Sequence, residues 1–303
     1  MIKRIFLFFI TNIAIIVLLG IVLAIVENVF GIKLSGIGQT YLNIFIYAII
    51  IGFAGSFISL FLSKWTAKRA YNIKLINQYE LSSISRKERL VFDIVYDLSN
   101  KHGIKLPEVG IYESREPNAF ATGATKNSSL VAVSTGLLNI MEENEIKGVV
   151  GHEMSHIFNG DMVTMVLLQG VMNTFVIFLS RVIANIVNSY FSKDEEGNGG
   201  YFIYYIVSMI LEIVLGILAS IIVMGFSRYR EYKADEGSAR LIGKENMIAG
   251  LKALKKMISS TSGDNSKLAT MKISTKTKGG LLALFSSHPD IDDRIEALER
   301  LTI

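Results

Sequence analysis

Two uncharged apolar stretches near the start of the chain constrain its fold more than any other feature. They run from Ile5 to Val26 and from Tyr41 to Leu62, and neither contains a charged residue. Each is as long as the roughly 20 residues that a helix needs to cross the hydrocarbon core of a bilayer. The first is too long for the apolar part of a cleavable signal peptide, and no clear cleavage site follows it. We therefore predict two transmembrane helices.

Two further apolar stretches contain polar residues. Met162 to Phe178 includes Gln169 and Asn173, and Tyr201 to Phe226 has Glu212 near its middle. A carboxyl group at the centre of a bilayer is costly, so Glu212 should be protonated, paired, or turned toward protein or water. The two stretches could cross the membrane as a hairpin or pack over the rest of the chain as a partly embedded lid. We favour the hairpin.

Charged residues flank these stretches unevenly. Positive residues precede the first stretch and follow the second and the fourth, whereas segment 193–200, between the third and the fourth, is net acidic. The flanking cations are Lys3, Arg4, Lys64, Lys68, Arg69, Arg228 and Arg230. The positive-inside rule then predicts that both termini and the soluble parts lie in the cytoplasm. The net charge of +4 is mild, so we interpret these cations as membrane-surface anchors and not as a nucleic-acid-binding surface.

The pattern His-Glu-x-x-His occurs once, at residues 152–156. His152 and His156 are four residues apart, so on a helix they share one face, and both imidazoles can bind a single Zn²⁺ at about 2.0–2.1 Å. Glu153 would project beside the metal, where it can take a proton from a bound water. The chain has only four histidines, so this pattern is unlikely to arise by chance. The plainer alternative is a helix with two surface histidines.

A catalytic zinc also needs a third protein ligand and an open fourth position. The chain has no cysteine, which excludes thiolate sites, disulfides and iron–sulfur clusters. Glu231 could supply the ligand, and Asp235, one helical turn later, could accept the second N–H of His152. The alternative is a solvated helix in which both carboxylates pair with neighbouring arginines and lysine, and the spacing does not decide between the two. A hairpin between His156 and Glu231 would return both to one side of the membrane.

Together these motifs resemble the HtpX-type membrane zinc metalloproteases, which share a peptidase family with the CAAX prenyl protease. That family pairs HExxH with a downstream ExxxD whose glutamate is the third zinc ligand, matching HEMSH at 152–156 and Glu231 with Asp235. The resemblance extends to PNAFATG at 117–123 and SHP at 287–289, and with the apolar stretches it covers nearly the whole chain. It implies a mainly α fold with a small β-sheet, in a multi-span membrane protein with a zincin-like metalloprotease domain.

The resemblance also assigns roles outside the ligand set. It implies that Asn118, Ala119 and Phe120 lie on an edge strand that pairs with extended substrate backbone, a mode that gives affinity with little sequence preference. It implies that His288 faces the cleft and stabilises the oxyanion of the tetrahedral intermediate. The residues alone favour a plain surface turn in the first case. In the second case they equally allow a helix-entry histidine bonded to backbone. We expect Arg294 to hold the last helix to the core, with no further role assigned.

The remaining chain supplies the elements of a small domain. Residues 85–101 have the apolar spacing of an amphipathic helix, and 105–112 and 129–133 are typical of short strands. Segment 259–280 is rich in Ser, Thr, Lys and Gly and predicts a flexible loop. The expected organisation is two N-terminal transmembrane helices with a basic juxtamembrane segment in 1–69, a metalloprotease domain in 70–161 and 227–303, and an inserted hydrophobic hairpin in 162–226.

The sequence thus predicts a multi-pass protein of the cell membrane that is a zinc endopeptidase with one Zn²⁺ per chain, acting on the cytoplasmic side. The resemblance implies substrates among misfolded or damaged membrane proteins, a role in stress response, and room for cooperation with other membrane proteases. One alternative is a prenyl-protein-type processing protease on the same core. Another is a membrane scaffold with a structural zinc, although such sites usually have four protein ligands and no open position.

Overall fold

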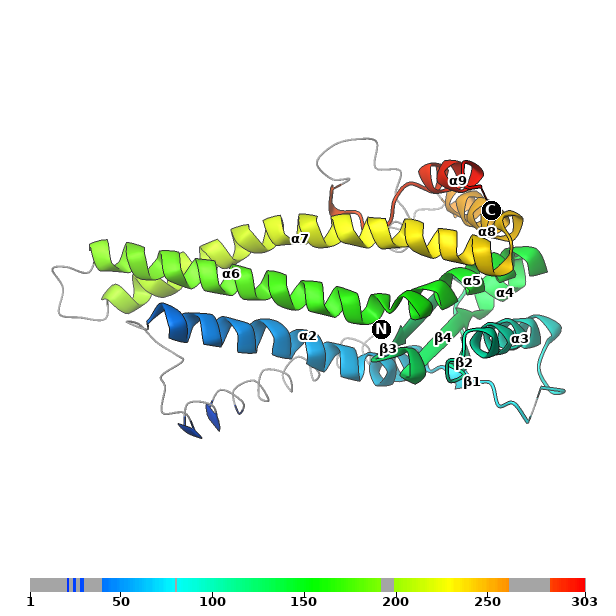
Figure 1. The fold of residues 1–303 in the computed structure, drawn as a ribbon, viewed down its shortest axis with the longest axis horizontal. Coiled ribbons are helices and arrows are strands. Elements are labelled where there is room, and N and C mark those ends of the chain that lie inside the picture. The colour runs from blue at the N-terminus through cyan, green and yellow to red at the C-terminus, as the bar shows by residue number, and fades with distance from the viewer. Residues whose placement is uncertain are drawn as a thin grey trace. The chain divides into compact units, whose positions relative to one another are not determined.

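The computed structural model describes residues 40–79, 81–191, 199–261 and 284–302, together with a few positions between 21 and 29. Within them the chain is mainly helical with one four-stranded sheet, which confirms the predicted fold class (Figure 1). The elements are α2 (Tyr41–Tyr71), β1 (Lys74–Leu75), α3 (Arg86–Lys101), β2 (Glu108–Tyr112), β3 (Ala119–Gly123), a 3₁₀ turn (Lys126–Ser128), β4 (Ser129–Ser134), α4 (Thr135–Ile140), α5 (Glu143–Asn159), α6 (Asp161–Phe191), α7 (Gly199–Ile242), α8 (Lys244–Thr261) and α9 (Ile291–Glu299).

Two of the sequence predictions concern segments that are mainly outside the described residues. The first predicted membrane helix, Ile5 to Val26, and most of the predicted loop 259–280 lie outside the described residues. The contacts divide the chain into two compact units. We call Met1–Ser59 with Thr164–Val223 the apolar unit, and Leu60–Val163 with Met224–Ile303 the mixed unit.

Among the described residues, three helices are long and apolar enough to cross a membrane. They are α2, α6 and α7, and α6 and α7 contain the two stretches that the sequence predicts as a hairpin. Both helices extend beyond those stretches, to 31 and 44 residues. At a rise of about 1.5 Å per residue either one exceeds the roughly 30 Å hydrocarbon core of a bilayer. Their length favours the spanning hairpin over the lid, and full crossing stays a prediction.

Polar side chains inside the apolar unit bond to neighbouring helices. Arg181 of α6 donates to the hydroxyl of Tyr47 in α2 at 3.1 Å and to that of Tyr204 in α7 at 3.3 Å. Its guanidinium also lies 4.3 Å from the centre of the Tyr47 ring. Asn173 accepts a hydrogen bond from Gln169 and donates weakly to the carbonyl of Gly52. Such bonds satisfy polar groups that lipid cannot, so they help to fix how the three helices meet.

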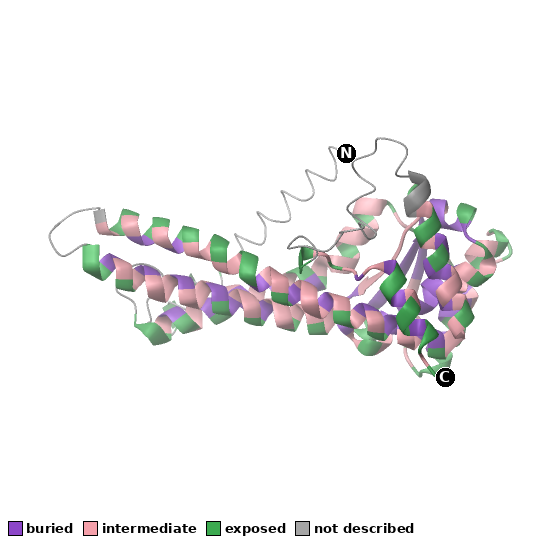
Figure 2. Ribbon diagram, turned by 90° about the horizontal axis from the view of Figure 1, so that it is seen from above, coloured by how far each residue is buried: buried purple, intermediate pink, exposed green. Residues whose placement is uncertain are grey.

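The mixed unit is built on a sheet with strand order β1-β2-β4-β3. Strands β2 and β4 are parallel, β3 runs antiparallel to β4 at one edge, and every residue of β4 is buried. Helices α3 and α5 pack together and against the strands, and their apolar residues form the main core. Figure 2 shows buried residues gathered around these strands. The edge strand β3 therefore lies next to the helix that carries HEMSH.

Local sequence explains where these helices begin and how closely they pack. The predicted amphipathic helix is α3, whose N-terminus has a capping box between Ser85 and Glu88. Helix α5 packs most extensively against α8, and the two backbones meet at Gly148. A Cβ added to Gly148 would lie 2.2 Å from the carbonyl oxygen of Asn246, well inside van der Waals contact. A glycine at this position therefore sets the spacing of α5 and α8.

We predict that Gly148→Ala destabilises the mixed unit, because the new methyl group must push α5 and α8 apart. Overpacking of this kind typically costs about 1–3 kcal/mol. The matched control is Gly225→Ala on α7, where only the Arg228 side chain lies within 4 Å of an added Cβ, at 3.7 Å. Thermal unfolding of both variants in detergent measures the effect. Equal midpoints for the two variants would show that α5 and α8 are not this tightly packed.

Candidate metal centre

The two histidines of HEMSH lie on a helix whose ends are well defined. Helix α5 begins with a capping box between Glu142 and Glu145 and ends at Gly160, which has a left-handed backbone at φ 71°. His152 and His156 lie one turn apart and are 7% and 8% exposed. Their Nε2 atoms are 3.1 Å apart. The alternative of a helix with two surface histidines is therefore wrong.

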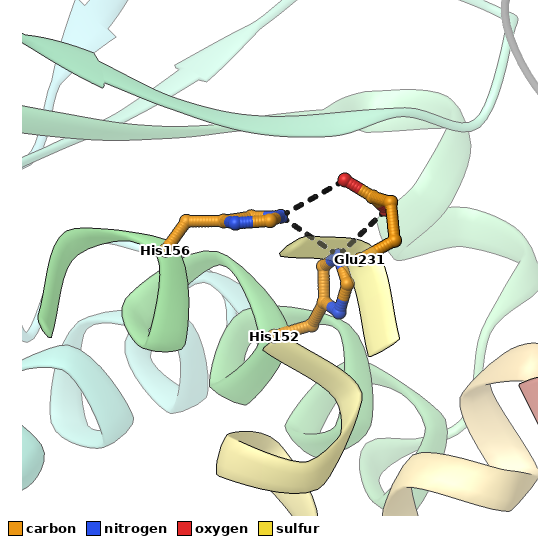
Figure 3. Close-up of side chains that lie close together, drawn as sticks. All are labelled: His152, His156 and Glu231. Atoms are coloured by element: carbon orange, nitrogen blue, oxygen red, sulfur yellow. Dashed lines mark hydrogen bonds and ion pairs between the residues drawn. The ribbon is translucent and has the colours of Figure 1, made fainter. Parts of the chain in front are cut away.

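Glu231 of α7 reaches the same point. Its Oε2 lies 3.4 Å from Nε2 of His152, and its Oε1 lies 3.3 Å from Nε2 of His156 (Figure 3). The side chain is 1% exposed, and that of Asp235 is 2% exposed. The alternative of a solvated helix for this segment is thus wrong as well. Among the described residues, these two histidines and Glu231 form the one group of three or more that could hold a metal ion.

The spacing of the three side chains fits a zinc ion. Two ligands of a tetrahedral zinc, each at about 2.0–2.1 Å, lie about 3.3 Å apart. The three separations between His152, His156 and Glu231 run from 3.1 to 3.4 Å. Both oxygens of Glu231 are buried, and neither accepts a well-aligned hydrogen bond from a described residue. A cation at the centre of this group would satisfy the carboxylate and both imidazoles together.

A second carboxylate lies behind each histidine. Nδ1 of His152 is 2.9 Å from Oδ1 of Asp235, the pairing that the sequence predicts. Nδ1 of His156 is 2.5 Å from Oδ2 of Asp161, the first residue of α6, which sequence analysis missed. A carboxylate on Nδ1 fixes the tautomer so that Nε2 is left unprotonated toward a metal. The sequence did contain a signal for this contact. Gly160 ends α5, and the turn there brings the next residue, Asp161, back to the end of that helix.

Arg294 of α9 is bound to the same network. Its Nε and Nη2 donate to the two oxygens of Asp235 at 2.7 and 2.6 Å, and its Nη1 lies 3.7 Å from Oε2 of Glu231. Such two-point pairs between arginine and carboxylate are strong and directional. Burial raises the pKa of Asp235, but the charges of Arg294 and His152 outweigh it and lower the pKa overall. Arg294 therefore holds α9 to α7 and keeps Asp235 ionised behind His152.

The electrostatics of the site favour a bound cation. Burial alone would raise the pKa of Glu231, but His152, His156 and His288 hold it well below its usual range. Burial alone would lower the pKa of His152, but Asp235 and Glu231 raise it to about 10. Without metal the site therefore holds a proton on imidazole at neutral pH. A metal ion must displace that proton, so metal affinity should fall as the pH falls.

The two predicted catalytic residues, Glu153 and His288, have defined contacts near this centre. Oε2 of Glu153 accepts a hydrogen bond of 2.8 Å from the backbone N–H of Ala121 in β3. Nδ1 of His288 lies 2.9 Å from Oε2 of Glu231, so this side chain is at the centre and not bonded to backbone at a helix entry. Both positions agree with the resemblance, and the catalytic roles stay predictions.

In the edge strand β3, the backbone N–H and C=O groups of successive residues point alternately toward β4 and toward the open side. The N–H and C=O of Asn118 are bonded to Ser134, and the N–H of Ala121 is directed away from β4 to Glu153. Because neighbouring residues in a strand point their backbone groups in opposite directions, Phe120 bonds toward β4 and Ala119 faces outward. The Phe120 ring packs near Tyr112 and Tyr71. Of the three predicted substrate-binding residues, only Ala119 presents its backbone to the open edge.

The model of peptidase family M48 matches residues 85–302, which include every residue of this centre. The chain belongs to peptidase family M48. Protease HtpX of Haemophilus influenzae is 51% identical over 98% of this chain and 99% of its own. Protease HtpX of Alkalilimnicola ehrlichii is 48% identical over 98% and 97%, and a protease HtpX homolog of Methylacidiphilum infernorum is 48% identical over 99% of each. The predicted resemblance is confirmed.

The fold is also known from a crystal structure. Ste24p of S. mikatae superposes with a TM-score of 0.67 over 99% of this chain and 67% of its own, at 17% identity. At that identity the likeness shows the fold alone. The chain is thus an HtpX-type metallopeptidase, a membrane protein with three candidate spans among its described residues, and it contains a buried group suited to a metal.

We predict that Asp161→Asn and Asp235→Asn each weaken zinc binding by roughly 10–100-fold, the usual cost of losing a carboxylate behind a histidine ligand. An amide cannot hold the imidazole in its metal-binding tautomer as firmly as a carboxylate. Zinc affinity is measured by competition with a chromogenic chelator. Asp97→Asn, an exposed residue of α3, is the control. Unchanged affinity in both site variants would exclude the orienting role.

Proposed function

We propose that this chain is a zinc-dependent endopeptidase, with one Zn²⁺ per chain, that cleaves misfolded or damaged membrane proteins at the cytoplasmic face of the cell membrane. The observation that carries the proposal is the buried triangle of His152, His156 and Glu231, with Glu153 beside it and an open strand edge next to it. A zinc held by these three residues would keep one position for water or substrate, as catalytic sites require.

Each side chain of the site has a separate role in the proposed peptide hydrolysis. When bound, a zinc ion supplies an activated water and polarises the scissile carbonyl. Glu153 takes a proton from the attacking water and delivers it to the leaving amine. His288 donates an N–H toward the developing negative charge on the carbonyl oxygen. Because Nδ1 of His288 faces Glu231, the N–H that this role needs is the one on Nε2.

The open edge of β3 supports the mode of substrate binding. The backbone of Ala119 faces outward and lies two residues from Ala121, whose amide holds Glu153. A substrate strand that pairs with Ala119 would run past Glu153. Recognition through backbone hydrogen bonds depends little on side chains. This property suits an enzyme whose substrates share an unfolded state and not a sequence.

The proposal that the mixed unit lies on the cytoplasmic side of the membrane rests on the distribution of positive residues. The cations Lys64, Lys68, Arg69, Arg228 and Arg230 follow apolar stretches in α2 and α7, which favours a cytoplasmic mixed unit. With 1–69 and 162–226 in the membrane, the substrates within reach are membrane proteins with exposed loops or tails. Cooperation with other membrane proteases fits this role in stress response. Within the described residues no fourth protein ligand joins the triangle, so the scaffold alternative has no support.

We predict that Glu153→Ala lowers the rate of casein cleavage by roughly 10²–10⁴-fold, the usual contribution of a general acid and base. Zinc binding should persist, because Glu153 is not a ligand in the triangle. The measurement pairs casein cleavage by the purified full chain in detergent with its zinc content. A chelator should abolish wild-type cleavage, and added Zn²⁺ should restore it.

Two results would contradict this scheme in different ways. Cleavage that survives Glu153→Ala with zinc still bound would exclude the proposed mechanism. Wild-type cleavage confined to farnesylated C-terminal peptides, with casein untouched, would favour the prenyl-processing alternative on the same core.

We predict that His288→Ala lowers kcat by about 10²-fold and leaves KM and zinc content nearly unchanged, because the lost hydrogen bond forms only in the transition state. His288→Gln should recover part of the rate, since it keeps an N–H donor. His102→Gln serves as the control, because His102 stacks on Phe158 at the end of α3, and it should retain activity. Loss of zinc along with activity would mean that His288 supports Glu231 and not the substrate.

A further inference from the structure

A basic cleft lies on the mixed unit beside the metal centre. It has a volume of about 360 Å³ and is formed by the junction of α5 and α6 and by one side of α7. Arg230, Lys233 and Arg240 line it together with Phe226 and Tyr229. A cleft of this size is within the range of small-ligand sites, about 300–1,000 Å³. The proposed hydrolysis uses none of these five residues.

The cations of this basic cleft exceed the carboxylates available to them. Lys233 and Arg240 share the single carboxylate of Glu236, each at 3.0 Å. The other acidic residue in the lining, Asp161, is already bound to a histidine of the metal centre. Arg230 has only a distant carboxylate, with Nη2 3.7 Å from Glu231. Its Nε is buried and has no hydrogen-bond partner among the described residues. The basic cleft thus offers excess positive charge.

The position of the basic cleft in the chain points to the membrane surface. The apolar run of α6 begins directly after Asp161, and that of α7 ends at Phe226, just before the first arginine. Aromatic rings with nearby cations are typical of the interface between hydrocarbon and water. The rings of Phe226 and Tyr229 lie 6.1 Å apart, and Tyr229 is 57% exposed. Arg228 is used differently, since it donates to the carbonyls of Leu284 and Ser286.

We infer that this basic cleft binds the phosphate headgroup of an anionic phospholipid. Arginine and lysine suit phosphate oxygens, and the adjacent rings suit the glycerol and upper acyl chains of the same molecule. An acidic peptide or a free phosphate would match the charge but not the aromatic border at the end of an apolar helix. The inference needs only that the chain is a membrane protein, and it stands apart from the proposed hydrolysis.

The test titrates the purified, delipidated full chain in detergent with short-chain phosphatidylglycerol and, in parallel, short-chain phosphatidylcholine. Bound lipid is measured by native mass spectrometry. Arg230→Gln with Lys233→Gln should weaken phosphatidylglycerol binding by at least tenfold, since one charge-assisted hydrogen bond is worth roughly tenfold or more. Lys252→Gln, an exposed cation of α8, should leave it unchanged. Wild-type binding should also weaken as salt is added.

Further experiments distinguish a lipid headgroup from other anionic ligands and control for variants that misfold. Glycerol 3-phosphate that competes as strongly as the lipid, or a polyglutamate peptide that binds in its place, would overturn the lipid assignment. Equal affinity for the two lipids, or no difference between the double variant and Lys252→Gln, would overturn it too. Lys233→Gln with Arg240→Gln, both at exposed positions, repeats the test if the Arg230 variant loses its fold or its zinc. These measurements do not depend on proteolytic activity.

Discussion

The buried carboxylate of Glu231 is the constraint around which the mixed unit is arranged. A carboxylate that is 1% exposed is costly unless a cation stabilises it. Three imidazole nitrogens lie 2.9 to 3.4 Å from its oxygens, and an arginine nitrogen lies 3.7 Å away. None of these groups donates a well-aligned hydrogen bond to it. The protein tolerates the buried charge because a divalent ion can occupy the space that the three side chains share.

The need for a cation beside Glu231 helps to explain why a single helix combines an apolar segment with a polar one. Helix α7 is 44 residues long, with an apolar part that can span a membrane and a polar end that carries Glu231 and Asp235. Glu231 and Asp235 lie one turn apart in that polar end, so they share one helix face. Asp161, at the start of α6, bonds His156 directly before the apolar run begins. Both membrane-directed helices thus end in residues of the metal centre.

Much of the site could be predicted from sequence because its spacing is local. The i, i+4 pairs His152–His156 and Glu231–Asp235 indicate one helix face each, and the carboxylate expected behind His152 lies 2.9 Å from it. Asp161 was missed because its contact depends on a left-handed turn at Gly160. Arg181 and its two tyrosines were missed because they join three separate helices. Periodicity describes the faces of a helix, and it does not give the distances between helices.

The balance of charges around the metal centre relates its carboxylates to the ion that the centre can hold. Four carboxylates, of Glu153, Asp161, Glu231 and Asp235, lie in or next to the site, against one buried permanent cation, that of Arg294. A divalent ion with neutral imidazoles would leave one net negative charge. Glu153 takes its proton from water within the same site, so the transfer moves that negative charge from the carboxylate to the hydroxide and leaves the net charge of the site unchanged. Without the ion, protons on the imidazoles take its place, in line with the raised pKa of His152. The carboxylates that orient the zinc ligands therefore also leave the site short of positive charge until a divalent ion or protons bind.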